Sequence, residues 1–127
     1  QAAGRAMIAA GRPGRIVNIA SAAGLRVLGH LSVYCMSKAA VIHMTRALAL
    51  EWGRYGINVN ALAPGYIATE INRDYWDTDG GKKLIGMLPR RRVGQPEDLD
   101  GLLLLLASEH SGFVNGAVIA ADDGLTL

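Results

Sequence analysis

The sequence is poor in charged, aromatic and sulfur-containing residues. Of its 127 residues, 19% are charged and 6% are aromatic, and Cys35 is the only cysteine. A single cysteine excludes an intrachain disulfide, and a reducing cytoplasm is the expected location. The net charge is only +2, and the aromatic residues are not interleaved with basic ones. We therefore expect no nucleic-acid partner.

A long hydrophobic run is also missing. The longest unbroken apolar stretch, LLLLLA at 102–107, is far too short to cross a bilayer, so no membrane association is expected. The first fifteen residues carry arginines inside their apolar stretch and do not form a signal peptide. The chain begins at Gln1 in an alanine-rich, helix-prone segment, as if a helix were already under way. We expect these residues to be part of a longer polypeptide.

Hydrophobic residues make up 50% of the chain, which is enough to build a core, and the length allows one domain. Strand and helix patterns alternate along the sequence. The expected strands cover 15–21, 57–63 and 115–121, and the expected helices cover 2–10, 31–54 and 95–108. This order predicts βαβ units, and therefore an α/β fold with a parallel sheet covered by helices.

The segment YCMSK places Tyr34 four residues before Lys38. Side chains at this spacing are neighbours on a helix surface. An ammonium beside the phenol would favour the phenolate form, which adapts a tyrosine to general acid/base work. The alternative is an ordinary surface pair, because this spacing is common by chance. The stripe that carries the pair is expected to face the sheet, and it consists of Tyr34, Lys38, Val41, Thr45, Leu48 and Trp52.

Three distant features are predicted to meet at one edge of the sheet. Ser21 closes the first predicted strand, and Pro64 with Gly65 closes the second. Tyr34 and Lys38 lie in the first turns of the helix between them. In parallel βαβ units the carboxyl ends of the strands share an edge, where open α/β sheets bind ligands. The placement favours a functional site over a surface pair.

The motifs that carry this pattern follow one another in a specific order. They are NIAS (18–21), with its serine thirteen residues before the tyrosine of YCMSK, then NVNALAPGYIAT (58–69) and RRVGQPEDLDGLLLLLASEHSGFVNGAVIAADDG (91–124). Together they resemble the short-chain dehydrogenase/reductase family over nearly all 127 residues. The resemblance implies the C-terminal half of a Rossmann-type doubly wound sheet, with about three parallel strands, in a domain that binds NAD or NADP.

The resemblance also implies roles for individual residues. Tyr34 would be the catalytic acid/base, Lys38 would hold the nicotinamide ribose hydroxyls, and Ser21 would hydrogen-bond the substrate oxygen. The residues implied to line the nicotinamide are Pro64, Gly65, Ile67 and Thr69. The reaction would be hydride transfer between the nicotinamide and a small-molecule carbonyl or secondary alcohol.

By the same resemblance, residues 66–95 form a lid over the substrate. Its largely apolar cover would come from Tyr66, Ile71, Tyr75, Trp76, Leu84, Met87 and Leu88. The three arginines at 90–92 could meet an anionic substrate, although solvated arginines at a loop end are the more common case.

The first half of the family pattern is absent from these residues. They contain no G-x-G and therefore no pyrophosphate-binding loop, and the NNAG strand and the asparagine of the proton relay are missing too. Most of the affinity for a dinucleotide comes from such contacts, so we expect the 127-residue chain alone to be inactive. The choice between NAD and NADP also depends on residues outside it.

A non-catalytic alternative is a truncated α/β domain that only associates with itself or with a partner. Its first strand would offer an unpaired edge at 15–21. The family commonly dimerises through helices that correspond to 1–10 and 31–54, which implies a homodimer or homotetramer for the full-length protein.

Other polar residues are expected to have structural roles. Ser32 would be a helix N-cap, the amides of Asn18 and Asn60 would bond to neighbouring backbone, and Cys35 would be a small buried residue. The three histidines share no metal-ligand spacing, so no metal site is expected.

Overall fold

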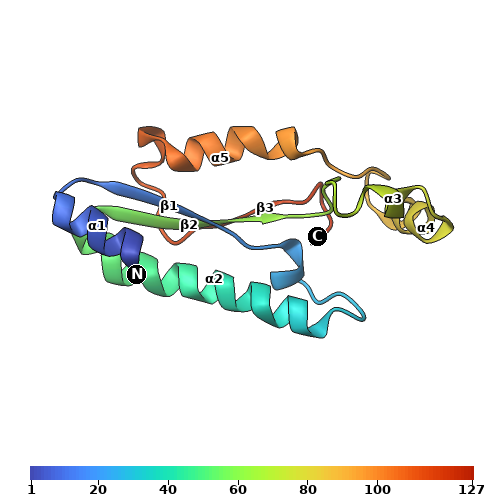
Figure 1. Ribbon diagram of the computed structural model, residues 1–127, viewed down its shortest axis with the longest axis horizontal. Helices are drawn as coiled ribbons and strands as arrows, with labels where there is room; N and C mark the ends of the chain where they lie inside the picture. Colours follow the sequence, from blue (N-terminus) through green and yellow to red (C-terminus); the bar gives the residue numbers. More distant parts are fainter.

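The computed structural model describes all residues from 1 to 127 and shows a sheet between two layers of helices (Figure 1). The strands β1 (Gly14–Ile19), β2 (Ile57–Pro64) and β3 (Val118–Ala121) are parallel and lie in the order β1-β2-β3. The helices α1 (Ala2–Ala10) and α2 (Ser32–Trp52) cover one face, and α5 (Asp100–Ala107) covers the other. The predicted α/β fold with a parallel sheet is confirmed.

The central strand β2 is buried along its whole length. Ile16 of β1 is its partner at Val59, and Ile119 of β3 is its partner at Leu62. A strand with neighbours on both sides and helices on both faces has no solvent-exposed face. Its side chains are therefore apolar or hydrogen-bonded throughout and do not alternate between apolar and polar.

The core under α2 consists of two clusters. Ala20, Ile42, Ala61 and Ala63 form one, and Ala49, Ile57 and Val59 form the other. The predicted stripe was right at Thr45, which is fully buried, but it missed Ile42 and Ala49. The buried residues of α2 are Cys35, Ile42, Thr45 and Ala49. Cys35 is therefore buried, as predicted.

Two asparagines of β2 hold the segment that leads into β3. The Nδ2 atom of Asn58 donates to the carbonyl oxygens of Ser111, Gly112 and Val114 at 3.1, 3.0 and 2.9 Å. The side chain of Asn60 donates to the Val114 carbonyl and accepts from the amide of Ala117, both at 2.9 Å. The prediction of backbone bonding is confirmed for Asn60. These bonds give partners to backbone groups of a segment that has no strand or helix partner of its own at this point.

Asn18 behaves differently from the prediction. Its Nδ2 atom donates to the hydroxyl of Thr45 at 2.9 Å, and that hydroxyl donates in turn to the carbonyl of Val41. The partner is therefore a side chain of α2 rather than neighbouring backbone. This bond fixes β1 to the helix that follows it.

The helix starts also differ from the predicted ones. Ser32 is the first residue of α2 and not its N-cap, because the carbonyl of Leu31 already accepts from the amide of Cys35 at 2.8 Å. The predicted helix at 95–108 begins with a 3₁₀ turn, η3 (Pro96–Leu99), before α5. The strand β3 starts at Val118 instead of residue 115, since the side chain of Asn60 engages the amide of Ala117.

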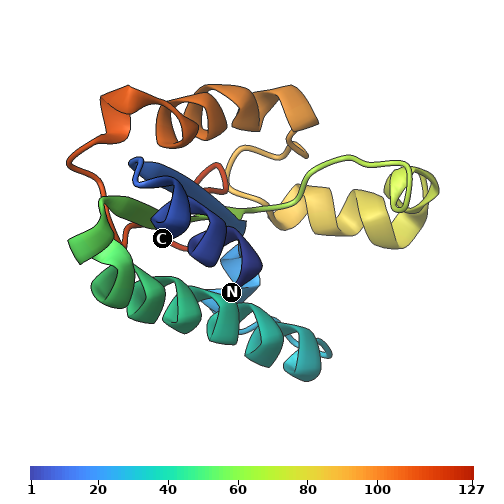
Figure 2. The same cartoon turned by 60° about the vertical axis from the view of Figure 1, so that its left-hand side comes forward.

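Residues 66–95 contain two helices, α3 (Arg73–Trp76) and α4 (Asp79–Met87). Both extend beyond the carboxyl ends of the strands, away from the three layers (Figure 2). The hydroxyl of Thr78 caps α4 by accepting from the amide of Gly81 at 3.1 Å. None of the helices is both long and apolar enough to cross a membrane.

Candidate active site

A cavity of about 520 Å³ lies at the carboxyl ends of β1 and β2. It brings together every residue that the sequence proposed for the site, from three separate segments. These residues are Ser21, Tyr34, Lys38, Pro64, Gly65, Ile67 and Thr69. The remaining wall is largely apolar and includes Leu103 of α5.

Ser21 stands just past the end of β1. The strand ends at Ile19, and the amide of Ala20 still bonds to the carbonyl of Leu62 at 2.8 Å. The Ser21 oxygen then accepts a hydrogen bond from the amide of Ala23 at 3.1 Å and so caps a short 3₁₀ turn, η1 (Ala22–Gly24). Because the oxygen serves as acceptor, the hydroxyl proton is left to donate to another group.

Tyr34 and Lys38 lie one turn apart near the start of α2. The Nζ atom of Lys38 donates to the carbonyl of Ile19 at 3.1 Å and stands 5.7 Å from the centroid of the Tyr34 ring. This distance is within the range of a cation–π contact. The Tyr34 side chain is 45% exposed. An ammonium has three donors, so Lys38 keeps two for a ligand.

Gly65 is required by the close approach of two chain segments. Its amide donates to the carbonyl of Ala121 at 3.0 Å, and a Cβ atom at this position would lie 2.8 Å from the Cα of Asp122. A side chain here would therefore push the end of β2 away from the segment after β3.

The chain after Gly65 runs beside Gly94 as a short parallel bridge. The amide of Gly94 donates to the carbonyl of Tyr66 at 2.9 Å, and the amide of Ala68 donates to the carbonyl of Gly94 at 2.8 Å. The N–H of Ile67 and the hydroxyl of Thr69 make no hydrogen bond within the chain. Both are thus available to a ligand in the cavity.

A second tyrosine at the cavity, Tyr66, differs from Tyr34 in its surroundings. Burial raises the pKa of the Tyr66 phenol above its ordinary value of 10.0, and the nearby Tyr75 raises it further. Its ring packs edge-on against Trp76 with centroids 5.9 Å apart. Tyr66 is therefore neutral at physiological pH and unsuited to accept a proton.

The free groups suit the nicotinamide riboside part of a dinucleotide. A carboxamide offers both an acceptor oxygen and donor N–H groups, which match the Ile67 N–H and the Thr69 hydroxyl. The two remaining N–H groups of Lys38 suit a pair of ribose hydroxyls. The hydroxyls of Ser21 and Tyr34 suit a substrate oxygen that changes its charge during reaction.

Several residues that line the cavity were not proposed from the sequence, among them four from the segments after Thr69. These four are Asn72, Asp100, Leu103 and Leu125. Asn72 had a local signal, since an asparagine three residues after Thr69 and directly before a helix can bond back to the turn. Leu125 had none, because its place depends on a bond from the Arg26 guanidinium to its carbonyl at 2.9 Å.

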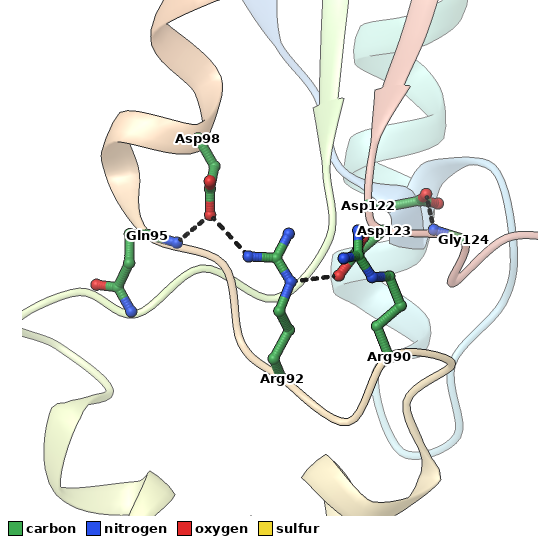
Figure 3. Close-up of polar contacts among 7 residues, drawn as sticks. All are labelled: Arg90, Arg92, Gln95, Asp98, Asp122, Asp123 and Gly124. Atoms are coloured by element: carbon green, nitrogen blue, oxygen red, sulfur yellow. Dashed lines mark hydrogen bonds and ion pairs between the residues drawn. The ribbon is translucent and has the colours of Figure 1, made fainter.

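The arginines at 90–92 lie next to this cavity but do not line it. Asp123 accepts from Arg90 at 3.1 Å and from the Nε of Arg92 at 2.7 Å (Figure 3). The hydrogen bond from Arg92, together with the positive charges, holds the pKa of Asp123 below its ordinary 3.8. Arg92 also stands 3.7 Å from Asp98, whose carboxylate accepts from the amide of Gln95. Arg90 and Arg92 line a second cavity of about 380 Å³. This second cavity adjoins the first and shares with it Gly65, Tyr66 and Ile67.

Comparisons with known proteins identify the family of the chain. The family model of enoyl-(acyl carrier protein) reductases matches residues 1–126. The NAD-dependent glycerol dehydrogenase of Listeria innocua is 40% identical over the whole chain, which covers 50% of that protein. The gluconate 5-dehydrogenase of Gluconobacter oxydans is 41% identical, again with 100% of this chain and 50% of that protein covered.

Solved structures show the same relationship. The gluconate 5-dehydrogenase of Burkholderia cenocepacia, in complex with NADP and tartrate, superposes with a TM-score of 0.89 at 40% identity over 96% of this chain and 48% of that one. A short-chain type dehydrogenase/reductase of Mycobacterium marinum gives 0.90 at 42% identity over 99% and 50%. The chain spans about half the length of the curated relatives it matches. It belongs to the short-chain dehydrogenase/reductase family.

Proposed function

We propose that these residues are the catalytic half of an NAD- or NADP-dependent oxidoreductase that interconverts a secondary alcohol and a carbonyl. The observation that carries this proposal is the meeting of Ser21, Tyr34 and Lys38 with the segment Pro64–Thr69 in one cavity. The relatives include dehydrogenases of glycerol and gluconate, which favours a polyol or a sugar acid as the substrate class.

Lys38 and the segment Pro64–Thr69 would hold the nicotinamide riboside, and the nicotinamide would supply the hydride chemistry at the carbinol or carbonyl carbon of the substrate. Tyr34 takes the hydroxyl proton during oxidation and returns it during reduction. The ammonium of Lys38, 5.7 Å from the Tyr34 ring centroid, stabilises the phenolate that is the proton acceptor. Ser21 donates a hydrogen bond to the substrate oxygen, which carries the developing negative charge.

The segment 66–95 is proposed as the lid on the substrate side. Its helices α3 and α4 extend beyond the strand ends (Figure 1), and Asn72, the residue before α3, lines the cavity. Closure of such a segment excludes water and brings the reacting groups together. Residues 1–127 would form the C-terminal part of a single Rossmann-type domain, and the whole protein would be a homodimer or homotetramer.

Turnover by the full-length protein tests this function. With NAD and NADP and a panel of polyols and sugar acids, we expect activity with at least one pair. Tyr34→Phe should lower kcat about 10²–10⁴-fold and leave the Kd for the cofactor nearly unchanged. Tyr55→Phe is the matched control, because that exposed tyrosine lies outside the cavity. Equal activity of the two variants would refute the role of Tyr34.

The 127-residue chain alone is proposed to be inactive, since its cavity offers groups for the nicotinamide riboside but no glycine-rich loop for the pyrophosphate. A measurable rate from the purified chain would contradict this. The free edge of β1 supports the non-catalytic alternative for the isolated chain. Sedimentation of the chain at rising concentration, together with cofactor titration up to millimolar levels, separates self-association from cofactor binding.

A further inference from the structure

We propose that Asn72 is a positioning residue that joins the turn at Ile67–Thr69 to the helix α3, so that cofactor binding and the position of the lid are linked. This inference rests on the proposed function, because it assigns the turn to the nicotinamide and α3 to the lid.

The side chain of Asn72 makes three hydrogen bonds to two elements. Its Oδ1 atom accepts from the amide of Thr69 at 2.7 Å and from the indole Nε1 of Trp76 at 3.0 Å. Its Nδ2 atom donates to the carbonyl of Ile67 at 2.9 Å. One carboxamide thus holds both ends of the turn and one residue of α3.

The position of Asn72 makes this use unusual. Asn72 is the N-cap residue of α3, where an asparagine ordinarily accepts from an amide of the first helical turn. Its side chain makes no such bond. The oxygen instead accepts from the turn before the helix and from the indole of Trp76, so the side chain joins the two elements and leaves the helix uncapped.

The three bonds require an amide. Only a side chain with an acceptor oxygen and a donor N–H on the same carbon can serve the Thr69 amide, the Trp76 indole and the Ile67 carbonyl together. A carboxylate would keep the two acceptor bonds and turn a second lone pair toward the Ile67 carbonyl. Alanine would lose all three.

The bonds fix groups that are proposed to face the nicotinamide. With its amide engaged by Asn72, Thr69 has only its hydroxyl left for a ligand, and the N–H of Ile67 is likewise unused within the chain. The turn is therefore held in the arrangement that leaves these two groups free. A turn without Asn72 has more conformations to lose when a carboxamide binds.

Trp76 carries the connection to the lid. Its ring packs edge-on against Tyr66 at 5.9 Å and against Tyr75 at 5.3 Å between centroids. Tyr75 lies in α3 and moves with Trp76, whereas Tyr66 lies in the chain that leaves β2. A movement of α3 away from the strand ends must therefore break the Trp76–Tyr66 contact and either the indole hydrogen bond to Asn72 or the bonds of Asn72 to the turn. Because coupling between two sites is reciprocal, a ligand that orders the turn also favours the closed position of α3.

The experiment uses the full-length protein with 5-fluorotryptophan. The ¹⁹F resonance of Trp76 is identified as the one that disappears in Trp76→Phe. In the wild type, titration with NAD or NADP should shift this resonance. In Asn72→Ala the Kd for the cofactor should rise about tenfold, the loss expected for a few hydrogen bonds to ordered groups, and the cofactor should no longer shift the resonance.

Two further variants sharpen the test. Asn72→Asp keeps both acceptor bonds, so the Trp76 resonance should stay near its wild-type position while the affinity for the cofactor remains reduced. Glu70→Ala, an exposed neighbour with no hydrogen bond or ion pair, should match the wild type in both readouts. If Asn72→Ala does not fold, Asn72→Asp alone tests the inference, because it should keep the Trp76 resonance near its wild-type position and still bind the cofactor more weakly.

The inference is overturned if a folded Asn72→Ala binds cofactor as the wild type does, or if cofactor still moves its Trp76 resonance to the wild-type bound position. It is equally overturned if Asn72→Asp shows full affinity. A wild-type protein that binds neither cofactor would refute the proposed function and this inference with it, whereas normal binding by Asn72→Ala would refute the inference alone.

Discussion

The Nζ atom of Lys38 bonds to the carbonyl oxygen of Ile19 at 3.1 Å, so the ammonium is anchored to the last residue of β1. This anchor sets its place beside the ring of Tyr34, which follows from the helical spacing of the two residues. The bond also satisfies a carbonyl at the strand end. Lys38 therefore contacts both the end of β1 and the ring of Tyr34.

Replacing Lys38 by Met keeps an unbranched side chain and removes the charge. In the full-length protein we expect kcat to fall about 10²-fold or more, because the phenolate loses its cation, and we expect the Kd for the cofactor to rise. Steady-state kinetics and cofactor titration measure the two effects. Lys82→Met, on the exposed surface of α4, is the control, and a similar loss in that variant would contradict the assignment.

The carboxylate of Asp123 predicts a pH-dependent stability difference. Its pKa is lowered, chiefly by the hydrogen bond from Arg92 and also by Arg90. A lowered pKa in the folded state contributes stability above the unfolded value, and this contribution disappears as the pH falls through the folded value. Asp123→Asn should therefore unfold at lower urea than the wild type at pH 7, with the difference shrinking below the ordinary pKa of 3.8.

The matched control for Asp123 is Asp77→Asn. Asp77 is exposed and takes part in no ion pair, so its replacement should change the urea midpoint little at either pH. Because the groups around Asp123 are also solvent-accessible, its effect should be modest. If the urea midpoints of wild type and Asp123→Asn differed by the same amount at pH 7 and below pH 3.8, the stability difference would not come from the ion pairs of Asp123.

Asn58 is expected to contribute more to stability than Asn18. Asn58→Ala removes three hydrogen bonds; the Ser111 carbonyl keeps the amide of Val114 and the Val114 carbonyl keeps Asn60, but the Gly112 carbonyl loses its donor. We expect this to cost about 2 kcal/mol of unfolding free energy. Asn18→Ala removes one bond to Thr45 and should cost about 1 kcal/mol. Urea unfolding followed by circular dichroism compares them, and the reverse ranking would refute this account.

Replacement by alanine should change the stability of the protein in opposite directions at two glycines. At Gly65 a Cβ atom meets the backbone of Asp122 at 2.8 Å, so Gly65→Ala should lower the melting temperature and weaken cofactor binding. At Gly101, inside α5, a Cβ atom meets nothing within 4 Å. Gly101→Ala should stabilise the helix by about 0.5–1 kcal/mol. Calorimetry measures both, and a stabilised Gly65→Ala would contradict the close approach.

The order of helices and strands was predictable because hydrophobic patterns and turn residues are local. The grouping of Ser21, Tyr34 and Pro64 was also predictable, since parallel strands end at one edge. Ser32 was assigned wrongly because its position relative to the N-cap depends on which carbonyl accepts the first helical bond. Which carbonyl accepts this bond depends on the backbone conformation at Leu31 and Ser32, and the residue types at these positions do not reveal it.

The bounds of the helix α4 could not be predicted for a different reason; the sequence indicates only a long loop at 66–95 with room for a short helix. The sequence of α4, DGGKKLIGM, contains three glycines and has low intrinsic helix propensity. The helix is supported by its Thr78 cap and by close packing of Gly81 against Tyr75 and Trp76, where a Cβ atom would collide. Such support is tertiary, so it has no signature in a hydrophobic pattern.

The burial of β2 from Ile57 to Pro64 has a consequence for the order in which the molecule loosens. Amide protons of a strand that is paired on both sides exchange with solvent only upon global opening. The cavity begins at Pro64, where this protected strand ends, whereas α3 and α4 are covered on fewer sides. On warming, we therefore expect deuterium to enter α3 and α4 long before it enters β2, so the outer wall of the site should loosen while the strand that carries the turn at Ile67–Thr69 stays closed.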